Sequence, residues 1–335
     1  MSRLSLRSMT AGCAIAAALS LLPLVGASAA DVKIRFGWAT TDAETDSYNF
    51  AAHAFAKALE AAKPGHFEVG YFPNRQLGDE KDMLQGIQVG SVDAALITNS
   101  IISNVDPAFT INDLPFLYAN AAQAYKLLDG PLGSELFARV RDKKIIGLAW
   151  CEAGFRNMAN RTRPITKPED LAGLKFRVIE SPLFVNMFKL LNSAGVPMPF
   201  GEVFTALQQG TIDGMENPTW SIASSKINEV TKYLSITRHI YSATPIVMSG
   251  RLFASMSPED QKIVVAAART ACDEERKFSA DSDAKIIKDL GAKGMTVNEV
   301  TDVAPFRAKM QPLYDEYRPK IGAELMDRWL AALKQ

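Results

Sequence analysis

Arg177 lies in a segment whose pattern places a charged side chain where a ligand could bind. The segment Gly173–Pro182 reads Gly-Leu-Lys-Phe-Arg-Val-Ile-Glu-Ser-Pro. Leu174, Phe176 and Val178 alternate along a predicted strand, so Arg177 faces the other side or emerges at the strand's carboxyl end. Open α/β sheets bind ligands at that end, and a planar guanidinium meets a carboxylate through two hydrogen bonds. The alternative is a surface arginine on an edge strand.

Asn217 is a second candidate. The segment Gly201–Pro218 predicts a helix, a glycine stop, a short strand and a loop. Pro218 favours an extended backbone at Asn217, and an amide held at a strand end both donates and accepts hydrogen bonds to a ligand. The alternative is a loop asparagine that makes only a local turn bond.

Signals for enzyme chemistry are missing from the sequence. His53, His66 and His239 form no metal-ligand pair at helical spacing. The sequence has no Gly-x-Ser-x-Gly elbow, no phosphate loop and no Gly-x-Gly-x-x-Gly after its first predicted strand. The acid pair Asp79-Glu80 is typical of a solvated helix start. We therefore expect no catalytic residue, no metal and no cofactor.

Composition limits the partners and the domain count. Lys+Arg and Asp+Glu both number 37, so the chain carries no basic excess for nucleic acid, which we do not expect as a partner. Its 47% hydrophobic and 22% charged residues are typical of a soluble globular protein. A length of 335 residues exceeds one ordinary core and suits two lobes.

Residues 1–30 have the pattern of a cleavable signal peptide. Arg3 and Arg7 precede the apolar run Ala11–Val25, which is followed by Gly-Ala-Ser-Ala-Ala-Asp. The run is about 15 residues, too short for a spanning helix. Cys13 lies inside the run and not after it, which argues against lipidation. We expect cleavage after Ala29 or Ala30 and a periplasmic location.

Periodicity predicts a βαβ organisation. Alternating apolar residues indicate strands at 32–38 and 67–71, and helical spacing indicates a helix at 47–62. A second helix at about 79–88 and a third strand at 92–97 follow. A short pattern recurs, because Gln88–Asp93 is echoed by Gln208–Asp213. In each copy a glycine suits the left-handed position that ends a helix. Strands alternating with helices and this repeat favour two similar α/β lobes. The alternative is that a match of only six residues is accidental.

We predict the following organisation for the chain after the signal peptide. Lobe 1 comprises residues 31–152 and is completed by about 245–290, lobe 2 comprises 153–244, and a helical region at 291–335 packs on the outside. Strands at 144–150 and 246–248 lie near the crossings. A helix from Ser257 to about Leu290 is long enough to brace both lobes. For Cys151 and Cys272, two unpaired buried thiols are favoured over a bridge, although an oxidising compartment allows one.

Several segments together resemble a known family. They are Phe176–Pro182, Val196–Pro218, Pro73–Glu80, Leu114–Leu117, Gly154–Arg156 and Lys232–Thr237. They look like the periplasmic substrate-binding subunits of tripartite ATP-independent (TRAP) transporters of the DctP type. The resemblance covers nearly the whole chain after residue 30. It implies a two-lobed α/β solute-binding fold with a hinge, crossing strands and a long bracing helix.

The resemblance also implies a set of ligand-binding residues. Arg177 would pair with a ligand carboxylate, Arg156 would be a second arginine near it, and Asn217 would be the asparagine of the Glu-Asn-Pro motif. Phe200 would form an aromatic wall. In lobe 1 the pocket positions are Trp38, Asp79, Thr98 and Asn99. The implied function is to capture a small organic acid anion without covalent chemistry and deliver it to the membrane permease, as a monomer.

Three other functions remain as alternatives: a binding protein of an ATP-driven transporter, a ligand sensor, and a secreted enzyme. The motifs Glu-Asn-Pro and Gly-Leu-Lys-Phe-Arg disfavour the first, and no acid, base or nucleophile supports the last. The sialic-acid branch of the resembling family has an additional arginine where this chain has Ile101, and an amide where it has Glu180. Sialic acid is therefore not expected.

Glu180 gives the one indication of ligand class. It follows Arg177 by three positions, so it is predicted to lie just beyond the strand end, near the carboxylate site. It would repel the second carboxylate of a C4-dicarboxylate and accept hydrogen bonds from hydroxyl groups. This favours a hydroxylated acid such as a sugar acid. The alternative is that Glu180 pairs with Arg156 or a nearby lysine.

Overall fold

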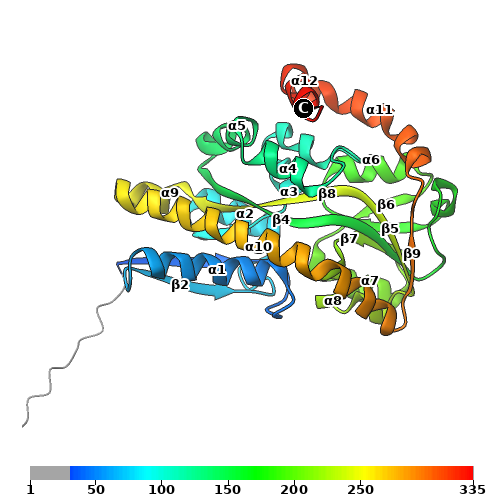
Figure 1. Ribbon diagram of the computed structural model, residues 1–335, viewed down its shortest axis with the longest axis horizontal. Coiled ribbons are helices and arrows are strands. Elements are labelled where there is room, and N and C mark those ends of the chain that lie inside the picture. The colour runs from blue at the N-terminus through cyan, green and yellow to red at the C-terminus, as the bar shows by residue number, and fades with distance from the viewer. Residues whose placement is uncertain (1–30, 335) are drawn as a thin grey trace, which may run out of the picture.

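The computed structural model describes residues 31–334. The predicted signal peptide, with Cys13, therefore lies outside the described residues. One nine-stranded mixed sheet runs through the molecule in the order β2-β1-β3-β8-β4-β7-β5-β6, with β9 paired to β8. Helices α1, α7, α8 and α10 cover one face, and α2 to α6 with α11 and α12 cover the other (Figure 1). None of the helices in residues 31–334 combines the length and apolar character of a membrane span.

The first half of the sheet has the predicted βαβ order. β1 (Val32–Gly37) pairs in parallel with β2 (Phe67–Phe72) and with β3 (Ala94–Leu96). The connecting helices are α1 (Ser47–Ala62) and α2 (Glu80–Val89). All five elements fall within a few residues of their predicted positions.

The second half repeats this arrangement. β5 (Lys175–Val178) pairs in parallel with β6 (Ala194–Pro197) and with β7 (Gly214–Asn217). The helices of this half are α6 (Pro182–Leu190), α7 (Val203–Gln209) and α8 (Thr219–Ser224).

The repeated hexapeptide has the same structural role in both halves. Gly90 and Gly210 end α2 and α7 with φ of 78° and 72°, the left-handed region that glycine adopts without a steric cost. Asp93 then accepts a hydrogen bond from the backbone N–H of Arg35 at 2.9 Å, and Asp213 accepts one from that of Lys175 at 2.8 Å. Each aspartate thus fixes the start of a neighbouring strand, and the predicted repeat is confirmed.

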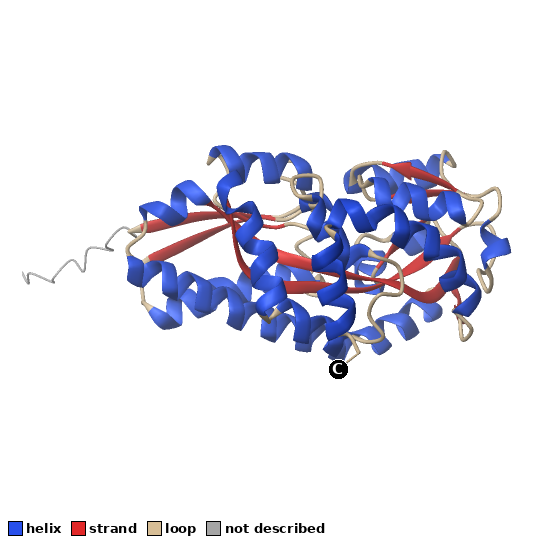
Figure 2. Ribbon diagram, turned by 90° about the horizontal axis from the view of Figure 1, so that it is seen from above, coloured by secondary structure: helices blue, strands red, loops and turns tan. Residues whose placement is uncertain are grey.

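Two long antiparallel strands join the halves. They are β4 (Ile145–Asn160) and β8 (Tyr233–Ser249), and they run between the two halves in Figure 2. β3 pairs with β8 and β7 pairs with β4, so each half is attached to one long strand by the same antiparallel contact. Both strands extend well beyond the predicted 144–150 and 246–248, and the proposed lobe boundaries at 152/153 and 244/245 fall inside them.

The predicted bracing helix is α10 (Pro258–Ala292). Ser257 caps it by accepting from the backbone N–H of Asp260 at 3.0 Å. It packs against α1 in one half, α8 in the other and β4 between them. The expectation of two unpaired thiols is wrong, because Cys151 of β4 and Cys272 of α10 form a disulfide with an S–S distance of 2.04 Å. The two cysteines are 121 residues apart in the sequence, and they come together only because α10 lies directly on β4.

The remaining elements cover the sheet. The helices are α3 (Asn99–Ile102), α4 (Ala121–Leu128), α5 (Pro131–Val140), α9 (Gly250–Ser255), α11 (Ala304–Ile321) and α12 (Ala323–Ala332). Short 3₁₀ helices lie at Pro107–Asp113, Arg141–Lys143, Pro168–Leu171, Phe200–Glu202 and Ile227–Glu229. The C-terminal region was predicted to be helical, but it also contains β9 (Thr296–Glu299), which adds a parallel strand beside β8.

Candidate functional site

A cavity of about 380 Å³ lies between the two halves, where the ends of β5 and β7 face α1, α2 and the residues after β3. Four residues predicted for the site line it: Arg177, Arg156, Asn217 and Phe200 from the second half and the crossing strand. Thr98 lines it from the first half. The other lining residues are Ala39, Thr40, Tyr48, Glu80, Ala153, Ile179, Pro218, Trp220 and Ser221.

Arg177 is buried, with 2% of its surface exposed, and it faces the cavity from β5. Its Nε donates to the carbonyl of Met198 at 3.0 Å, and its guanidinium lies 5.7 Å from the ring centre of Phe200. No carboxylate in residues 31–334 forms an ion pair with it. Burial lowers the pKa of Arg177 to about 10, with Arg156 adding to the effect, so the group stays charged at neutral pH. The edge-strand alternative is wrong, because β5 lies between β6 and β7.

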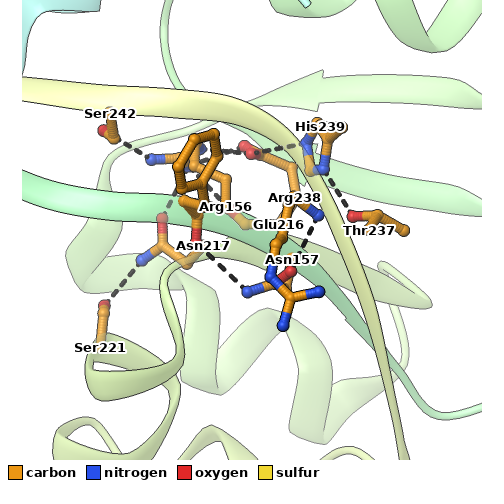
Figure 3. Close-up of polar contacts among 10 residues, drawn as sticks. Arg156, Asn157, Glu216, Asn217, Ser221, Thr237, Arg238, His239 and Ser242 are labelled. Atoms are coloured by element: carbon orange, nitrogen blue, oxygen red, sulfur yellow. Dashed lines mark hydrogen bonds and ion pairs between the residues drawn. The ribbon is translucent and has the colours of Figure 1, made fainter. Parts of the chain in front are cut away.

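Arg156 lies beside Arg177 but is already paired. Its Nη2 donates to Glu216 Oε1 at 2.7 Å, to the Glu216 carbonyl at 2.7 Å and to Asn217 Oδ1 at 2.6 Å, and its Nε contacts Glu216 Oε2 (Figure 3). Nη1 donates to Ser242 Oγ at 3.3 Å. Both partners of the ion pair are buried. The protein itself therefore neutralises Arg156.

Glu216, the partner of Arg156, was not among the residues predicted from the sequence. It lies in the Glu-Asn-Pro motif, which was the available signal. His239 Nε2 is 3.3 Å from Glu216 Oε2, and His239 Nδ1 is 2.7 Å from Thr237 Oγ1. Burial raises the pKa of Glu216, but Arg156 and His239 together outweigh it and hold the pKa below its ordinary value.

Asn217 has both ends of its amide engaged. Its Oδ1 accepts from Arg156, and its Nδ2 donates to Ser221 Oγ at 2.7 Å. The extended backbone at the residue before Pro218 is that of β7, as predicted. Asn217 is thus fixed in orientation at the cavity wall by Arg156 on one side and α8 on the other.

Glu80 supplies a carboxylate from the first half. The backbone N–H and the hydroxyl of Thr98 donate to its Oε1 at 3.0 and 2.7 Å. Within residues 31–334 its Oε2 has no hydrogen-bond partner, and it forms no ion pair. Burial raises the pKa of Glu80, and the hydrogen bonds from Thr98, followed by the charges of the two cavity arginines, partly offset this. Glu80 begins α2, as the interpretation of a helix start requires, but its side chain is only partly exposed and lines the cavity.

Glu180 and Asp79 line a smaller adjoining cavity of about 260 Å³ that shares Arg177 and Phe200 with the first. The backbone carbonyl of Glu180 accepts from Asn104 Nδ2 at 3.0 Å, and its carboxylate has no ion-pair partner within residues 31–334. The alternative in which Glu180 pairs with Arg156 is wrong, because Arg156 pairs with Glu216.

Two residues predicted for the pocket lie elsewhere. Trp38 is fully buried in the core, where its Nε1 donates to the carbonyl of Thr41 at 2.9 Å. Asn99 is also fully buried, and its amide donates to the Phe109 carbonyl and to Asp113 Oδ2, each at 2.8 Å. Both follow strand ends, but their side chains turn into the core and satisfy local backbone and carboxyl groups.

Two aromatic residues of the cavity were not predicted. The rings of Tyr48 and Trp220 lie 5.1 Å apart, one from α1 and one from α8. Tyr48 OH lies 3.0 Å from Thr244 Oγ1, and Trp220 Nε1 donates to the Ala153 carbonyl at 2.7 Å. Tyr48 lies on an ordinary amphipathic helix, where no sequence pattern distinguishes it from a core residue.

Comparison with known sequences identifies the family. The model of bacterial extracellular solute-binding proteins, family 7, also called DctP, matches residues 38–320. The chain belongs to this family. A relative from Escherichia coli, the 2,3-diketo-L-gulonate-binding periplasmic protein YiaO, is 35% identical over 300 residues, covering 90% of this chain and 89% of that protein.

Solved structures of family members show the same fold. A TRAP periplasmic solute-binding protein from Polaromonas sp. JS666, bound to D-erythronate, is 36% identical with a TM-score of 0.86, covering 90% of this chain and 98% of that one. Another, from Sulfurospirillum deleyianum with bound succinate, is 28% identical with a TM-score of 0.85, covering 90% and 99%. The two-lobed α/β solute-binding fold is therefore shown, and members of this fold hold both hydroxylated and dicarboxylic acids.

Proposed function

We propose that this DctP-type protein is the periplasmic receptor of a TRAP transporter and captures a small hydroxylated organic acid anion. One observation carries the proposal: Arg177 is a buried cation that faces the cavity and forms no ion pair within the described residues. Burying a charge without a partner is costly, so such a site favours an anionic ligand that supplies the partner. A carboxylate fits the guanidinium fork.

The rest of the cavity supports a hydroxylated ligand. With a carboxylate at Arg177, the ligand chain would lie against Phe200 and reach toward Glu80 and Glu180. Both carboxylates have a free acceptor oxygen among the described residues, and each would accept a hydroxyl hydrogen while repelling a second carboxylate. The ligands of the relatives from Escherichia coli and Polaromonas agree with this class.

A thermal-shift screen tests the proposal. D-Erythronate, gluconate, glucuronate, malate and succinate would be compared with erythritol, which has hydroxyls but no carboxylate. A ligand that binds only the folded state raises the melting temperature. At least one hydroxy acid should raise it and erythritol should not. If no acid raises it, or if erythritol does so equally, the organic-acid receptor is refuted.

We further propose that the chain is exported and acts as a monomer beside the permease. The signal-peptide pattern of residues 1–30 and the family's extracellular description support export, and the monomeric state rests on the family resemblance alone. N-terminal sequencing of the protein from a periplasmic fraction should begin at Ala30 or Asp31. A mature protein that begins at Met1 in the cytoplasm would contradict export.

A further inference from the structure

A second cavity lies on the opposite side of β4 from the acid-binding cavity. Its lining residues surround about 690 Å³ of space, part of which is open to solvent. Ala153, Pro218 and Trp220 line both cavities, so they form the wall between them. The remaining lining comes from α4, the crossing strands, Thr219 of α8, and α10, which places the cavity behind the junction of the two halves.

Glu152 puts a buried carboxylate into this second cavity. It is 4% exposed, and its Oε2 accepts from Tyr125 OH at 2.9 Å. The hydroxyl of Tyr241 is a second hydrogen-bonding neighbour that lowers the pKa of Glu152, and neither carboxylate oxygen belongs to an ion pair within residues 31–334. A buried carboxylate that faces a cavity and has no ion-pair partner among the described residues is the counterpart of Arg177 in the first cavity, with the opposite charge.

Asp283 adds a second carboxylate from α10. Its Oδ1 accepts from Thr219 Oγ1, and within the described residues Asp283 also has no ion-pair partner. Burial raises the pKa of Glu152, and the negative charge of Asp283 contributes to the increase. A cation bound between the two would offset both effects.

The nearby cations are already paired. Arg276 contacts Asp129 through Nη1 and Nη2 at 2.7 and 3.0 Å, and Arg238 at the cavity rim contacts Glu299 at 2.7 Å. Glu275, also buried behind β4, accepts from Ser47 and from the backbone N–H of Glu152, and it has no ion pair in residues 31–334. With the phenols of Tyr125 and Tyr241, these are the titratable groups around Glu152. Burial and the neighbouring Glu152 raise the pKa of Glu275, so the negative charge that faces the cavity comes from Glu152 and Asp283.

The remaining wall is aromatic. Tyr125, Phe155 and Trp220 line the cavity beside the two carboxylates. Aromatic faces attract organic cations, and carboxylates provide the opposite charge. A metal ion is disfavoured, because no group of three or more His, Cys, Asp or Glu side chains in residues 31–334 is arranged to hold one. The guanidinium of Arg276 already lies 4.3 Å from the ring centre of Tyr125, which leaves the rings of Phe155 and Trp220 to a ligand. We propose that the second cavity binds a small organic ammonium ion between Glu152, Asp283 and these two rings.

Isothermal calorimetry on the mature protein tests this with choline as the probe. Its uncharged isostere, 3,3-dimethyl-1-butanol, has the same shape without the positive charge. Ethanolamine distinguishes a primary from a quaternary ammonium. We expect saturable binding of choline or ethanolamine with one site per chain, and no binding of the isostere. Equal binding of the isostere, or no binding of either ammonium ion, would overturn the proposal.

Two variants locate the site. Asp283→Asn should weaken ammonium binding about tenfold or more, because it removes a charged acceptor from the cavity. Asp281→Asn is the matched control: Asp281 lies two residues away on α10, is 69% exposed, pairs with Lys277 and should have no effect. Glu152→Gln serves as an independent second variant if Asp283→Asn folds poorly. Unchanged affinity in folded Asp283→Asn and Glu152→Gln, or equal loss in Asp281→Asn, would overturn the assignment.

Discussion

Arg156 Nη2 lies 2.7 Å from Glu216 Oε1 in a buried ion pair, whereas the neighbouring Arg177 has no carboxylate partner within the described residues. The two arginines of the cavity therefore have different roles. Arg156 ties β4 to β7 and orients Asn217, while the charge of Arg177 remains available to a ligand.

The first prediction concerns Arg177. Arg177→Ala should weaken binding of the tightest organic acid at least tenfold, because truncating one member of a buried charged pair costs roughly 2–5 kcal/mol. Arg177→Lys keeps the charge but loses the two-point fork, so its affinity for the acid should fall between that of the wild type and that of Arg177→Ala. Calorimetry measures the affinity and circular dichroism checks folding. Arg141→Ala, at an exposed arginine, is the control. Wild-type affinity in Arg177→Ala would refute the assignment.

The second prediction concerns ligand class. Glucuronate and gluconate should bind more tightly than succinate, with malate between them, because hydroxyls donate to Glu80 and Glu180 and a second carboxylate is repelled. Competition calorimetry gives the order, and D-erythronate against succinate compares two four-carbon acids directly. Glu80→Gln and Glu180→Gln should each reduce the difference in affinity between the hydroxylated acids and succinate. Succinate binding more tightly than every hydroxylated acid would refute the argument without affecting the family.

The third prediction concerns closure of the two halves. The β4–β8 pairing shifts register between Glu152 and Gly154, and Gly154 has φ of 88°, a conformation that side chains other than glycine rarely adopt. This irregularity lies at the junction, where bending would occur. Small-angle scattering should give a smaller radius of gyration with saturating ligand. An unchanged radius, with binding confirmed by calorimetry, would contradict closure.

The fourth prediction concerns the Cys151–Cys272 disulfide. It closes a loop across 121 residues, so its loss should lower the free energy of unfolding by about 2–4 kcal/mol. Urea unfolding of the Cys151→Ser/Cys272→Ser double variant, compared with the oxidised wild type, measures the loss. A reductant should destabilise the wild type and leave the double variant unchanged. Two titratable thiols in the folded, unreduced protein would show that the bond is absent.

The fifth prediction concerns pH. Burial, and then the neighbouring Glu152, raises the pKa of Glu275 above its ordinary value. Between the unfolded-state pKa of about 4.3 and the raised folded-state pKa, the folded chain holds more protons than the unfolded chain. The contribution of Glu275 to stability is therefore full at acidic pH and falls as pH rises through this interval, by at most about 1.4 kcal/mol per pH unit.

Glu275→Gln mimics the protonated acid and should flatten this dependence between pH 5 and pH 8 in urea unfolding. The neighbouring Glu274 is exposed, so Glu274→Gln should keep the wild-type slope. A wild-type slope retained in Glu275→Gln would show that this carboxyl does not cause it.

The sequence predicts those elements whose signal is local. The repeat with Gly90 and Gly210, the cap at Ser257 and the alternation along β1 all depend on neighbours in the chain. The long reach of β4 and β8 was underestimated, because strands buried on both faces lose the alternation of apolar and polar residues.

The pairings in the site were missed for a different reason. Arg156 and Glu216 are 60 residues apart, and Cys151 and Cys272 are 121 apart, so no local pattern records their contact. Glu80 begins a helix, a position where solvated acidic residues are common. It lines the cavity only because the other half of the molecule lies opposite it.

The route of the chain constrains the order in which its two halves can fold during synthesis. α1 packs on α10, and β3 pairs with β8, so both early elements wait for partners that leave the ribosome much later. β5, β6 and β7 are complete by Asn217 and find β4 already made. The half that is translated first is thus the last to be finished, and its apolar helix face stays open to chaperones or a translocase for most of translation.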